Sequence, residues 1–468
     1  MEDLFEKVER RDKVKYDVVV IGSGIGGYPA AIYLANKGFK TAIVEEHMIG
    51  GECTNYGCVP TKALYHIAEA MRAVSKVNGK IEYDWANLAT WVKNIVTASR
   101  EGIQYLLEKN NVEIYMGKAL LKTRRTLKIS EEGREIEADK LILALGTDPV
   151  DLPNVRFDGK GVLSNREVVY LDEKPGSMLI IGGGVVGVEM ANVFSSLGVD
   201  ITVVEISDHI LPFADKDVAT ALRSYLVEKG IKIYEGTSVM RIDKVNGKYI
   251  AHLSSGKEVC IDKVLVAIGR KPKTSGIGLV EAGIELDNKG FIKVNETYEA
   301  VPGIYAVGDV IGGQLLAHKA LLESISVARA ISGDGFFRVN YDAMPVTIFT
   351  GLEIALIGST EKQLRERGIK YIKVKLPIYH LASVKIKGSR HSFVKVLMDS
   401  DKGEKIYGLQ IVAPNASEIV SSYLPLYLGK ISIEETMKLP YPHLTVSESL
   451  RELAEYIMGE SIHIILKR

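Results

Sequence analysis

The cysteine pair Cys53 and Cys58 is the feature of this sequence that most directly indicates chemistry. The chain holds three cysteines, and the third, Cys260, is far from the pair in the sequence. A disulfide needs Cα atoms within about 7 Å, whereas five residues of a regular α-helix rise about 7.5 Å. A bridge between the two cysteines therefore requires an interrupted helix, and Gly57 supplies the backbone freedom for the interruption.

The residues after the pair predict a helix whose N-terminus lies beside Cys58. Pro60 suits the first turn of a helix, where its missing N–H costs no hydrogen bond. A thiol at that end has a lowered pKa because the helix dipole favours the thiolate. Three interpretations of the pair remain open from these residues. It is a redox couple, two inert core thiols, or half of a zinc site for which the sequence offers no second cysteine pair.

A dinucleotide-binding fingerprint precedes the cysteines. Residues 16–21 are apolar except for Asp17 and predict a buried parallel strand. A glycine-rich turn, a helix and a second strand at 41–44 follow it. The second strand ends at Glu45, which is placed to accept hydrogen bonds from a ribose. The glycines allow a tight turn and a close approach of the backbone to a pyrophosphate at the helix N-terminus. The pattern G-x-G-x-x-G is met by Gly22, Gly24 and Gly27.

The same unit occurs a second time. Residues 177–181 predict a strand, and the strand at 201–204 ends at Glu205. Two fingerprints imply two bound dinucleotides, or a duplicated layer with one inactive site. A carboxylate at Glu205 pairs with a ribose 2′-OH and repels a 2′-phosphate, so we expect the second nucleotide to be NAD rather than NADP. The repeated glycines are Gly182, Gly184 and Gly187.

The order of predicted elements indicates an α/β fold with one Rossmann-like dinucleotide-binding domain inserted in another. The outer, FAD-binding domain comprises residues 1–147 and a return segment at 271–338, and the inserted NAD-binding domain comprises 148–270. Residues 339–468 form a C-terminal α+β domain, for which we expect a dimerisation role. Its antiparallel strands at 393–398 and 407–412, joined by the polar loop 399–405, precede helices at about 416–429, at 433–438 and from about 446 onward.

Two polar residues have both a structural and a chemical interpretation. Asp309 follows a strand and either caps the helix at 315–332 or holds a ribityl hydroxyl of a flavin. His443 is either an ordinary loop histidine or a general base with a pKa near 7. The sequence Thr445-x-x-Glu448 predicts a capping box at the last helix, and Glu448 is also placed to orient His443.

Composition excludes several classes of protein. The 468 residues carry a formal net charge of zero, which does not favour nucleic acid or membrane partners. The charged segment 1–12 is unlike a signal peptide, and no apolar run approaches the ~18 residues of a membrane span. Few cysteines and no export signal predict a cytoplasmic protein, in which a disulfide is catalytic rather than structural.

Five motifs together resemble the flavoprotein disulfide reductases, the class I pyridine nucleotide-disulfide oxidoreductases, and most closely the dihydrolipoamide dehydrogenases among them. The resemblance extends from about residue 16 to residue 465. The motif around the cysteines is highly specific for this family. The motifs are GGECTNYGCVPTK at 50–62, GGGVVGVE at 182–189, GIYAVGDV at 303–310, LAHKA at 316–320 and HLTVSE at 443–448.

The resemblance implies roles for individual residues. Cys53 exchanges with the substrate disulfide and Cys58 faces the flavin, while His443 is the catalytic base with Glu448 as its partner. Lys62 and Glu189 match an ion pair beside flavin N5. We expect FAD and NAD contacts, and no metal, at Gly22, Gly24, Gly27, Glu45, Gly51, Lys62, Gly117, Gly146, Thr147, Gly182, Gly184, Gly187, Glu189, Glu205, Gly269, Asp309 and Ala317.

The resemblance also implies partners. Family members are homodimers in which the histidine serves the other subunit's cysteines. The implied substrate is the lipoyl group of a carrier protein or free lipoamide, with a 2-oxoacid dehydrogenase complex as host. The alternatives are an NADH-dependent reductase of another low-molecular-weight disulfide and a non-catalytic redox-sensing flavoprotein. The absence of cysteine after residue 260 speaks against relatives that carry a C-terminal cysteine pair.

Five features depart from the usual lipoamide pattern, and the first is Thr61, where serine is more usual. Leu444 replaces a proline, Tyr441 stands where a second histidine is usual, and Gly351 lies in a segment without the usual His-Pro. The basic stretch 385–390 is also unusual. These departures leave open which disulfide the protein serves.

Overall fold

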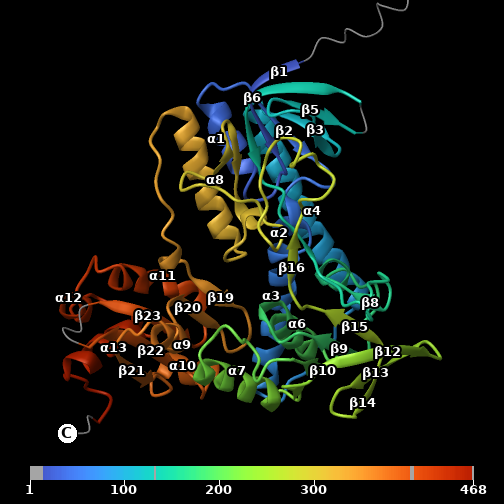
Figure 1. The fold of residues 1–468 in the computed structure, drawn as a ribbon. Coiled ribbons are helices and arrows are strands. Elements are labelled where there is room, and N and C mark those ends of the chain that lie inside the picture. The colour runs from blue at the N-terminus through green and yellow to red at the C-terminus, as the bar shows by residue number, and fades with distance from the viewer. Residues whose placement is uncertain (1–13, 131–132, 401–404, 466–468) are drawn as a thin grey trace, which may run out of the picture. The chain divides into compact units, whose positions relative to one another are not determined.

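The computed structural model describes residues 14–130, 133–400 and 405–465 (Figure 1). The charged segment 1–12 and residues 401–404 of the expected polar loop lie outside the described residues. The chain divides into two compact units. Unit 1 comprises Met1–Ala63, Ala86–Val150 and Gly269–Val339, and unit 2 comprises Leu64–Trp85, Asp151–Ile268 and Asn340–Arg468.

Unit 1 is built on a sheet with the strand order β17-β18-β6-β1-β2-β3. Strand β1 is parallel to both of its neighbours, β2 and β6, and its valines at 18–20 are fully buried, as expected for a central strand covered on both faces. Strands β4 and β5 extend the sheet antiparallel beside β6. The strands are β1 (Val14–Ile21), β2 (Thr41–Glu45), β3 (Glu113–Met116), β4 (Ala119–Leu121), β5 (Thr126–Ile129), β6 (Glu135–Leu143), β17 (Glu299–Val301) and β18 (Ile304–Ala306).

Helices and a small ribbon complete the elements around this sheet. Strands β7 (Thr147–Pro149) and β16 (Arg270–Pro272) pair antiparallel. Helix α3 (Cys58–Ser75) begins in unit 1 and continues into the segment assigned to unit 2. The other elements are α1 (Tyr28–Asn36), α2 (Gly51–Asn55), α4 (Trp85–Lys109), the 3-10 helix η2 (Gly308–Ile311) and α8 (Ala317–Ser332).

Unit 2 contains a second sheet of the same kind, with the strand order β11-β10-β9-β15-β8 and parallel pairing throughout. Strand β9, helix α6 and strand β10 repeat the succession of β1, α1 and β2. The elements are β8 (Val162–Leu163), α5 (Asn165–Val168), β9 (Ser177–Ile181), α6 (Val185–Ser196), β10 (Asp200–Val204), α7 (Lys216–Glu228), β11 (Lys232–Tyr234), β15 (Lys263–Val266) and the antiparallel meander β12 (Val239–Val245), β13 (Lys248–Leu253) and β14 (Glu258–Ile261).

The C-terminal part of unit 2 is a five-stranded antiparallel sheet with the order β19-β20-β23-β22-β21. The predicted hairpin at 393–412 is therefore confirmed. The elements are η3 (Tyr341–Ala343), β19 (Val346–Ile348), β20 (Ile354–Gly358), α9 (Glu361–Glu366), β21 (Tyr371–Pro377), α10 (Ala382–Lys387), β22 (Phe393–Asp399), β23 (Ile406–Val412), α11 (Ala416–Tyr427), α12 (Ile433–Met437) and α13 (Glu448–Met458).

The predicted fold class is confirmed, since two dinucleotide-type sheets, the first mainly and the second wholly parallel, are accompanied by a C-terminal α+β domain. The segment of the second parallel sheet interrupts the chain of the first. The boundaries at residues 147, 270 and 338 stay predictions. Within the described ranges, no helix is both long enough and apolar enough to cross a membrane.

Candidate active site

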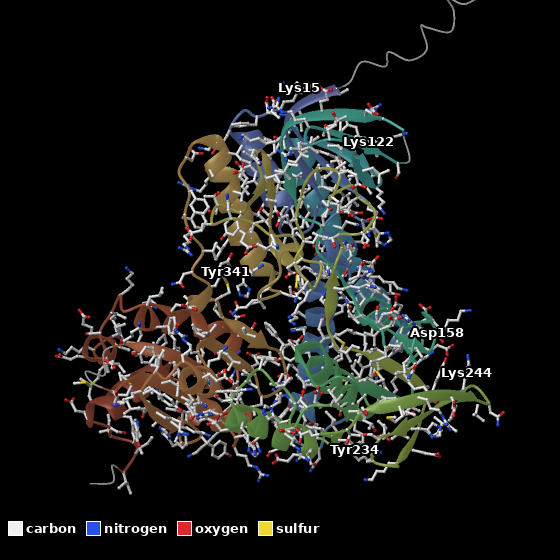
Figure 2. All side chains as sticks on the ribbon, viewed as in Figure 1. Lys15, Lys122, Asp158, Tyr234, Lys244 and Tyr341 are labelled. Atoms are coloured by element: carbon white, nitrogen blue, oxygen red, sulfur yellow. A yellow bond between two sulfur atoms is a disulfide. The ribbon has the colours of Figure 1, made fainter. Side chains whose placement is uncertain are left out.

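Cys53 and Cys58 form a disulfide, with their Cα atoms 4.8 Å apart. Cys53 lies in α2 and Cys58 is the first residue of α3, and the helical path is broken at residues 56–57 as the spacing predicts. Neither cysteine is buried, which argues against inert core thiols. Figure 2 shows the described side chains with sulfur in yellow. Cys260 is exposed and free.

The cysteine segment packs directly on the first glycine loop, within unit 1. Gly51 has a φ of +62°, and a Cβ atom there would lie 2.6 Å from the Cα atom of Gly24. The backbone N–H of Gly50 donates a 3.1 Å hydrogen bond to the hydroxyl of Ser23, in the same loop. Gly51 is therefore required for the close approach of the disulfide segment to the fingerprint.

The first fingerprint uses its glycines in two ways. A Cβ atom on Gly22 would lie 2.3 Å from the carbonyl oxygen of Ala144, and one on Gly27 would lie 1.8 Å from that of Gly22. Glycine is required at these two positions because neighbouring backbone atoms occupy the space that a side chain would need. Gly24 has no protein atom closer than 3.8 Å to such a Cβ position. Its missing side chain leaves space outside the loop, which fits a closely approaching pyrophosphate.

The second fingerprint has the same steric pattern, within unit 2. A Cβ atom on Gly182 would lie 2.4 Å from the carbonyl oxygen of Ala267, and one on Gly187 would lie 1.9 Å from that of Gly182. Nothing lies within 4 Å of a Cβ position on Gly184. Both loops therefore present the cradle that a dinucleotide needs, and neither has the filled loop of an inactive copy.

The two acids that follow the fingerprints make equivalent contacts. In each acid, one carboxylate oxygen accepts a hydrogen bond from the backbone N–H of the second fingerprint residue. The other oxygen accepts a hydrogen bond from the backbone N–H two residues after the acid. Both are buried. The contacts are Ser23 N to Glu45 Oε2 at 2.9 Å, His47 N to Glu45 Oε1 at 2.8 Å, Gly183 N to Glu205 Oε2 at 2.6 Å and Ser207 N to Glu205 Oε1 at 2.7 Å.

Asp309 accepts a 3.1 Å hydrogen bond from the hydroxyl of Thr147. Burial raises the pKa of the Asp309 carboxyl, although the Thr147 hydrogen bond and the nearby charges of Arg270 and Lys319 oppose the rise. The capping interpretation of Asp309 is wrong. It lies in the separate 3-10 helix η2, and α8 begins after Leu316 without a side-chain cap.

Arg270 is a site residue that sequence reasoning missed. Its guanidinium donates to the Thr147 hydroxyl at 2.7 Å and to the Thr147 carbonyl at 2.8 Å, and it pairs with Glu52 at 3.1 Å. It therefore connects the residue that binds Asp309 to the segment of the disulfide. The only sequence signal for it is its position at the end of an apolar run after Gly269.

A buried ion pair, Lys319–Glu323, was also missed. The two groups are 3.2 Å apart, with side chains 3% and 0% exposed. Glu323 accepts the amide of Gly308 at 2.7 Å, and Lys319 donates to the carbonyl of Gly308 at 3.1 Å. The pair therefore holds the turn that carries Asp309. The sequence signal for this pair is the i, i+4 spacing of Lys319, in the LAHKA motif, and Glu323. Ala317, in the same motif, is the first residue of α8.

The remaining predicted cofactor residues lie as follows. Gly117 donates its amide to the Glu45 carbonyl at 2.7 Å, and Gly146 and Gly269 have positive φ with no protein atom within 4 Å of a Cβ position. Lys62 is on α3, four residues after Cys58 and on the same helical face. Glu189 is buried on α6 and accepts the amide of Phe349 at 2.9 Å.

His443 and Glu448 are in contact as predicted, within unit 2. His443 Nδ1 lies 3.0 Å from Glu448 Oε1, with side chains 78% and 10% exposed. The second Glu448 oxygen accepts the amide of Thr445 at 3.0 Å. The full capping box is wrong, since Thr445 Oγ1 donates to the carbonyl of Pro442 and α13 begins after Ser447 without a side-chain cap.

Two of the departures from the lipoamide pattern have structural reasons or consequences. Glycine is required at position 351, because a Cβ atom there would lie 1.9 Å from the hydroxyl of Tyr225. Leu444 is 42% exposed and lines a hollow of about 320 Å³ together with Lys387 of the basic stretch. The hollow adjoins the segment that carries His443.

The first fingerprint, the disulfide, Thr147, Arg270 and Asp309 thus all belong to unit 1. The second fingerprint and the His443–Glu448 pair belong to unit 2. A redox disulfide packed on one dinucleotide loop, with a second dinucleotide loop in the same chain, can pass electrons between a dithiol and a nicotinamide through a flavin.

Comparisons with known proteins agree with this arrangement. Residues 16–330 match the family model described as pyridine nucleotide-disulphide oxidoreductase, and residues 344–454 match the dimerisation domain of the same family. The second match supports a homodimer. The dihydrolipoyl dehydrogenase of Thermus scotoductus is 35% identical over 464 residues, which cover 96% of this chain and 99% of that protein.

Further relatives and solved structures cover the chain to the same extent. The dihydrolipoyl dehydrogenase of Trypanosoma brucei brucei is 36% identical and covers 96% of this chain and 98% of its own length. LpdA from Mycobacterium tuberculosis superposes with a TM-score of 0.86 at 26% identity, covering 95% of this chain and 100% of its own. The chain therefore belongs to the pyridine nucleotide-disulphide oxidoreductase family, as an NAD-linked flavoprotein disulfide oxidoreductase that uses FAD and NAD(H).

Proposed function

We propose that the protein is a dihydrolipoamide dehydrogenase, which oxidises a dihydrolipoyl dithiol and reduces NAD⁺. The observation that carries the proposal is the Cys53–Cys58 disulfide packed on the first dinucleotide loop through Gly51. The curated relatives named dihydrolipoyl dehydrogenase, at 33–36% identity over nearly the full chain, support the choice of substrate.

The cysteine pair performs the thiol exchange. A thiolate of the substrate attacks Cys53 Sγ, the Cys53–Cys58 bond breaks, and Cys58 leaves as a thiolate. The second substrate thiol then displaces Cys53 and releases the cyclic disulfide. The substrate loses two electrons and two protons, and the cysteine pair gains the electrons. The helix dipole at the start of α3 stabilises the Cys58 thiolate. When bound, FAD supplies the two-electron relay between the thiols and the nicotinamide.

His443 accepts the substrate's thiol protons in this proposal. Glu448 orients the ring through Nδ1 and leaves Nε2 directed away from the pair. Because the His443 side chain is 78% exposed in the single chain, it is available to a second protomer. We propose that it serves the disulfide of the partner subunit, and that the lipoyl group arrives on a carrier protein of a 2-oxoacid dehydrogenase complex.

The experiment is a comparison of kcat/KM for the FAD-loaded homodimer across substrates. Dihydrolipoamide with NAD⁺ is measured beside NADH-driven reduction of lipoamide, glutathione disulfide and cystine. We expect the lipoyl pair to give the highest values. A higher kcat/KM for glutathione disulfide or cystine would assign the protein to the reductases of other small disulfides. Reversible cycling of the cysteines without turnover of any substrate would make it a redox-sensing flavoprotein.

A further inference from the structure

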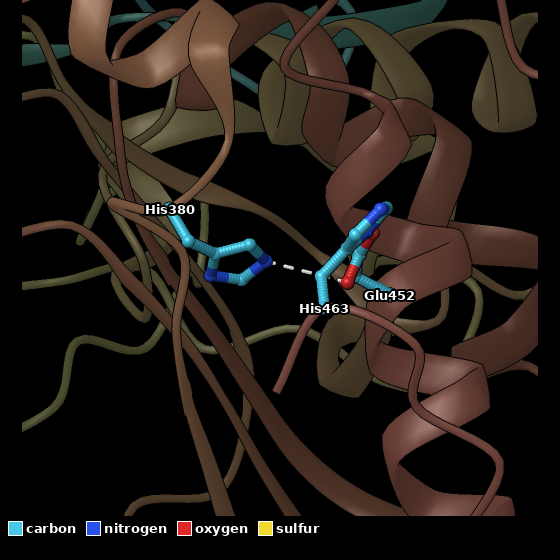
Figure 3. A group of neighbouring side chains, drawn as sticks. All are labelled: His380, Glu452 and His463. Carbon is cyan, nitrogen blue, oxygen red and sulfur yellow. Dashed lines mark hydrogen bonds and ion pairs between the residues drawn. The ribbon is translucent and has the colours of Figure 1, made fainter. Parts of the chain in front are cut away.

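Three side chains outside the redox machinery converge at the C-terminal sheet of unit 2 (Figure 3). His380 follows β21, Glu452 lies in the second turn of α13, and His463 lies beyond the end of that helix. His380 Nε2 is 3.3 Å from Glu452 Oε2, and His463 Nδ1 is 2.5 Å from Glu452 Oε1. The three potential ligand atoms all lie within 4.8 Å of one another.

The ring of His380 is held by a backbone carbonyl on its far side. His380 Nδ1 lies 3.1 Å from the carbonyl oxygen of Pro377, which can only accept a hydrogen bond. A neutral imidazole has one N–H, so it cannot donate both to this carbonyl and to the Glu452 carboxylate. A protonated imidazole satisfies both acceptors with its two N–H groups, and so does a neutral imidazole with a metal cation between Nε2 and the carboxylate. Histidine ligands of metals typically donate their other N–H to such a carbonyl.

The negative charge at this place is buried. The Glu452 side chain is 0% exposed, and its basic neighbours in the described part of the chain are the two histidines and Arg451, which is 4.0 Å away. Glu455, one turn further along α13, is also buried, and its Oε2 has no hydrogen-bond partner among the described residues. Arg451 pairs with the other oxygen of Glu455 at 3.2 Å. A bound cation would therefore supply positive charge chiefly to the buried carboxylate of Glu452.

We propose that His380, Glu452 and His463 bind one divalent transition-metal ion, with Zn²⁺ as the best match. Two imidazoles and one carboxylate are a preferred set for zinc, which takes four ligands and accepts water as the fourth. The His463 side chain is 51% exposed, which gives the ion a route from solvent. Magnesium is disfavoured because it prefers oxygen ligands.

A second acidic cluster shows the contrast. The carboxylates of Asp215, Asp217 and Glu361 also converge, but the ammonium of Lys395 lies among them, 2.6–3.1 Å from each. The Lys395 ammonium therefore already neutralises these carboxylates, and the cluster needs no metal ion. The His380–Glu452–His463 cluster has no lysine in the equivalent role among the described residues.

The ion would act as a structural clamp on α13. Glu452 and Glu448 are four residues apart and share one face of this helix, and Glu448 is the partner of His443. Bound metal would tie the segment after α13 and the loop after β21 to the helix that positions His443. Metal binding at this cluster does not depend on which disulfide the protein uses as its substrate.

The test is calorimetric titration of the oxidised, FAD-loaded homodimer with Zn²⁺, in a Cys260→Ser background that removes the exposed thiol. We expect one zinc per protomer and a rise in melting temperature that EDTA reverses. His380→Gln and His463→Gln should each weaken binding at least ~10-fold, since even outer-shell changes cost about 10–100-fold. Mg²⁺ should not compete.

The matched control is His391→Gln. His391 also contacts a carboxylate, Glu228 at 2.8 Å, but Arg390 occupies the same oxygen. Zinc affinity should be unchanged in this variant. His463 is exposed, so its substitution tests the site even where a buried substitution such as Glu452→Gln prevents folding. No binding by the parent, or parent affinity in both histidine variants, would overturn the proposal.

Discussion

The carboxylate of Glu205 accepts a 2.6 Å hydrogen bond from the amide of Gly183, the second residue of the second fingerprint. Its other oxygen accepts the amide of Ser207 at 2.7 Å. Glu205 therefore shapes the glycine loop, in addition to the ribose contact that the sequence predicts. Removing it would disturb the loop as well as the selectivity for the nicotinamide.

The next residue, Ile206, allows selectivity to be changed without that disturbance, since it is 75% exposed. We expect the native protein to prefer NAD over NADP by about 10²-fold or more in kcat/KM, because a carboxylate repels a 2′-phosphate. Ile206→Arg should raise kcat/KM for NADP and largely preserve that for NAD. Glu205→Arg should reduce the ratio of kcat/KM for NAD to kcat/KM for NADP, but it should also lower kcat/KM for NAD. Equal values for both nicotinamides in the native protein would contradict this assignment.

The glycine fingerprints could be predicted from the sequence because their constraints are local. Gly22 and Gly182 have positive φ, and a Cβ atom on Gly27 or Gly187 would lie 1.8 Å or 1.9 Å from the carbonyl oxygen of the first glycine in its own loop. The five-residue spacing likewise predicts that a bridge between Cys53 and Cys58 needs an interrupted helix, as the structure has, although the spacing alone leaves the bridge itself open. In each case the backbone geometry of a few neighbouring residues decides the structure.

Apart from the His443–Glu448 contact, the polar contacts that hold the site could not be predicted in this way. Arg270 reaches Thr147 across 123 positions of sequence, and only the fold brings them together. The predicted cap at Asp309 failed because a separate 3-10 turn intervenes before α8. The predicted capping box failed because the hydroxyl of Thr445 turns to a preceding carbonyl.

Replacement of the candidate base should separate proton transfer from folding. His443→Gln should slow dihydrolipoamide oxidation at least about 10²-fold, since general-base catalysis contributes about 10²–10⁴-fold. Flavin binding should persist because the side chain is exposed. Glu448→Gln should slow the reaction less. Steady-state rates and flavin absorbance check both variants, and a near-native rate for His443→Gln would exclude it as the base.

Mixed dimers test whether the base crosses between subunits. Inactive His443→Gln and Cys53→Ser homodimers are combined under conditions of proven subunit exchange. If the base serves the partner's disulfide, a heterodimer contains one intact site and should recover up to half of native activity. No recovery despite exchange would put base and disulfide in the same chain.

The buried pair Lys319–Glu323 should be important for stability. Lys319→Met leaves Glu323 buried without its cation, and breaking such a pair costs about 3–5 kcal/mol. The double replacement Lys319→Met/Glu323→Leu should be less destabilised than the single one. Urea unfolding followed by flavin fluorescence measures this, and a double variant as unstable as Lys319→Met would contradict the assigned role.

The ion-pair cluster of Lys395 with Asp215, Asp217 and Glu361 should widen the pH range over which the protein is stable. Burial acts to raise the pKa of Asp217 and of Glu361, but the hydrogen bond and charge of Lys395, together with those of other neighbouring groups, outweigh it and both pKa values are lowered. The stability they contribute is present above their unfolded values of about 4 and is lost as pH falls through the folded values. Burial acts to lower the pKa of Lys395, but Asp217 and Asp215 raise it overall. That contribution is present below about pH 10.4 and is lost as pH rises further.

Lys395→Met should therefore lose most stability, relative to the native protein, between about pH 5 and 10, with the difference shrinking at both extremes. Lys373→Met is the control, because Lys373 also contacts Glu361, at 3.4 Å, but is 46% exposed. Its effect should be small, as for surface pairs. Melting temperatures across pH check the profile, and a difference that is independent of pH would rule out the charge network as its origin.

The most direct test of the redox account is anaerobic reduction of the FAD-loaded protein by dihydrolipoamide, followed spectroscopically. Cys58 lies at the N-terminus of α3, where its thiolate is stabilised beside the expected flavin. Two-electron reduction should produce a long-wavelength absorption band from that thiolate, and NAD⁺ should then be reduced. Cys58→Ser should abolish the band, while Cys260→Ser should leave it intact. An unchanged band in Cys58→Ser would contradict the assignment of the Cys53–Cys58 pair as the redox centre.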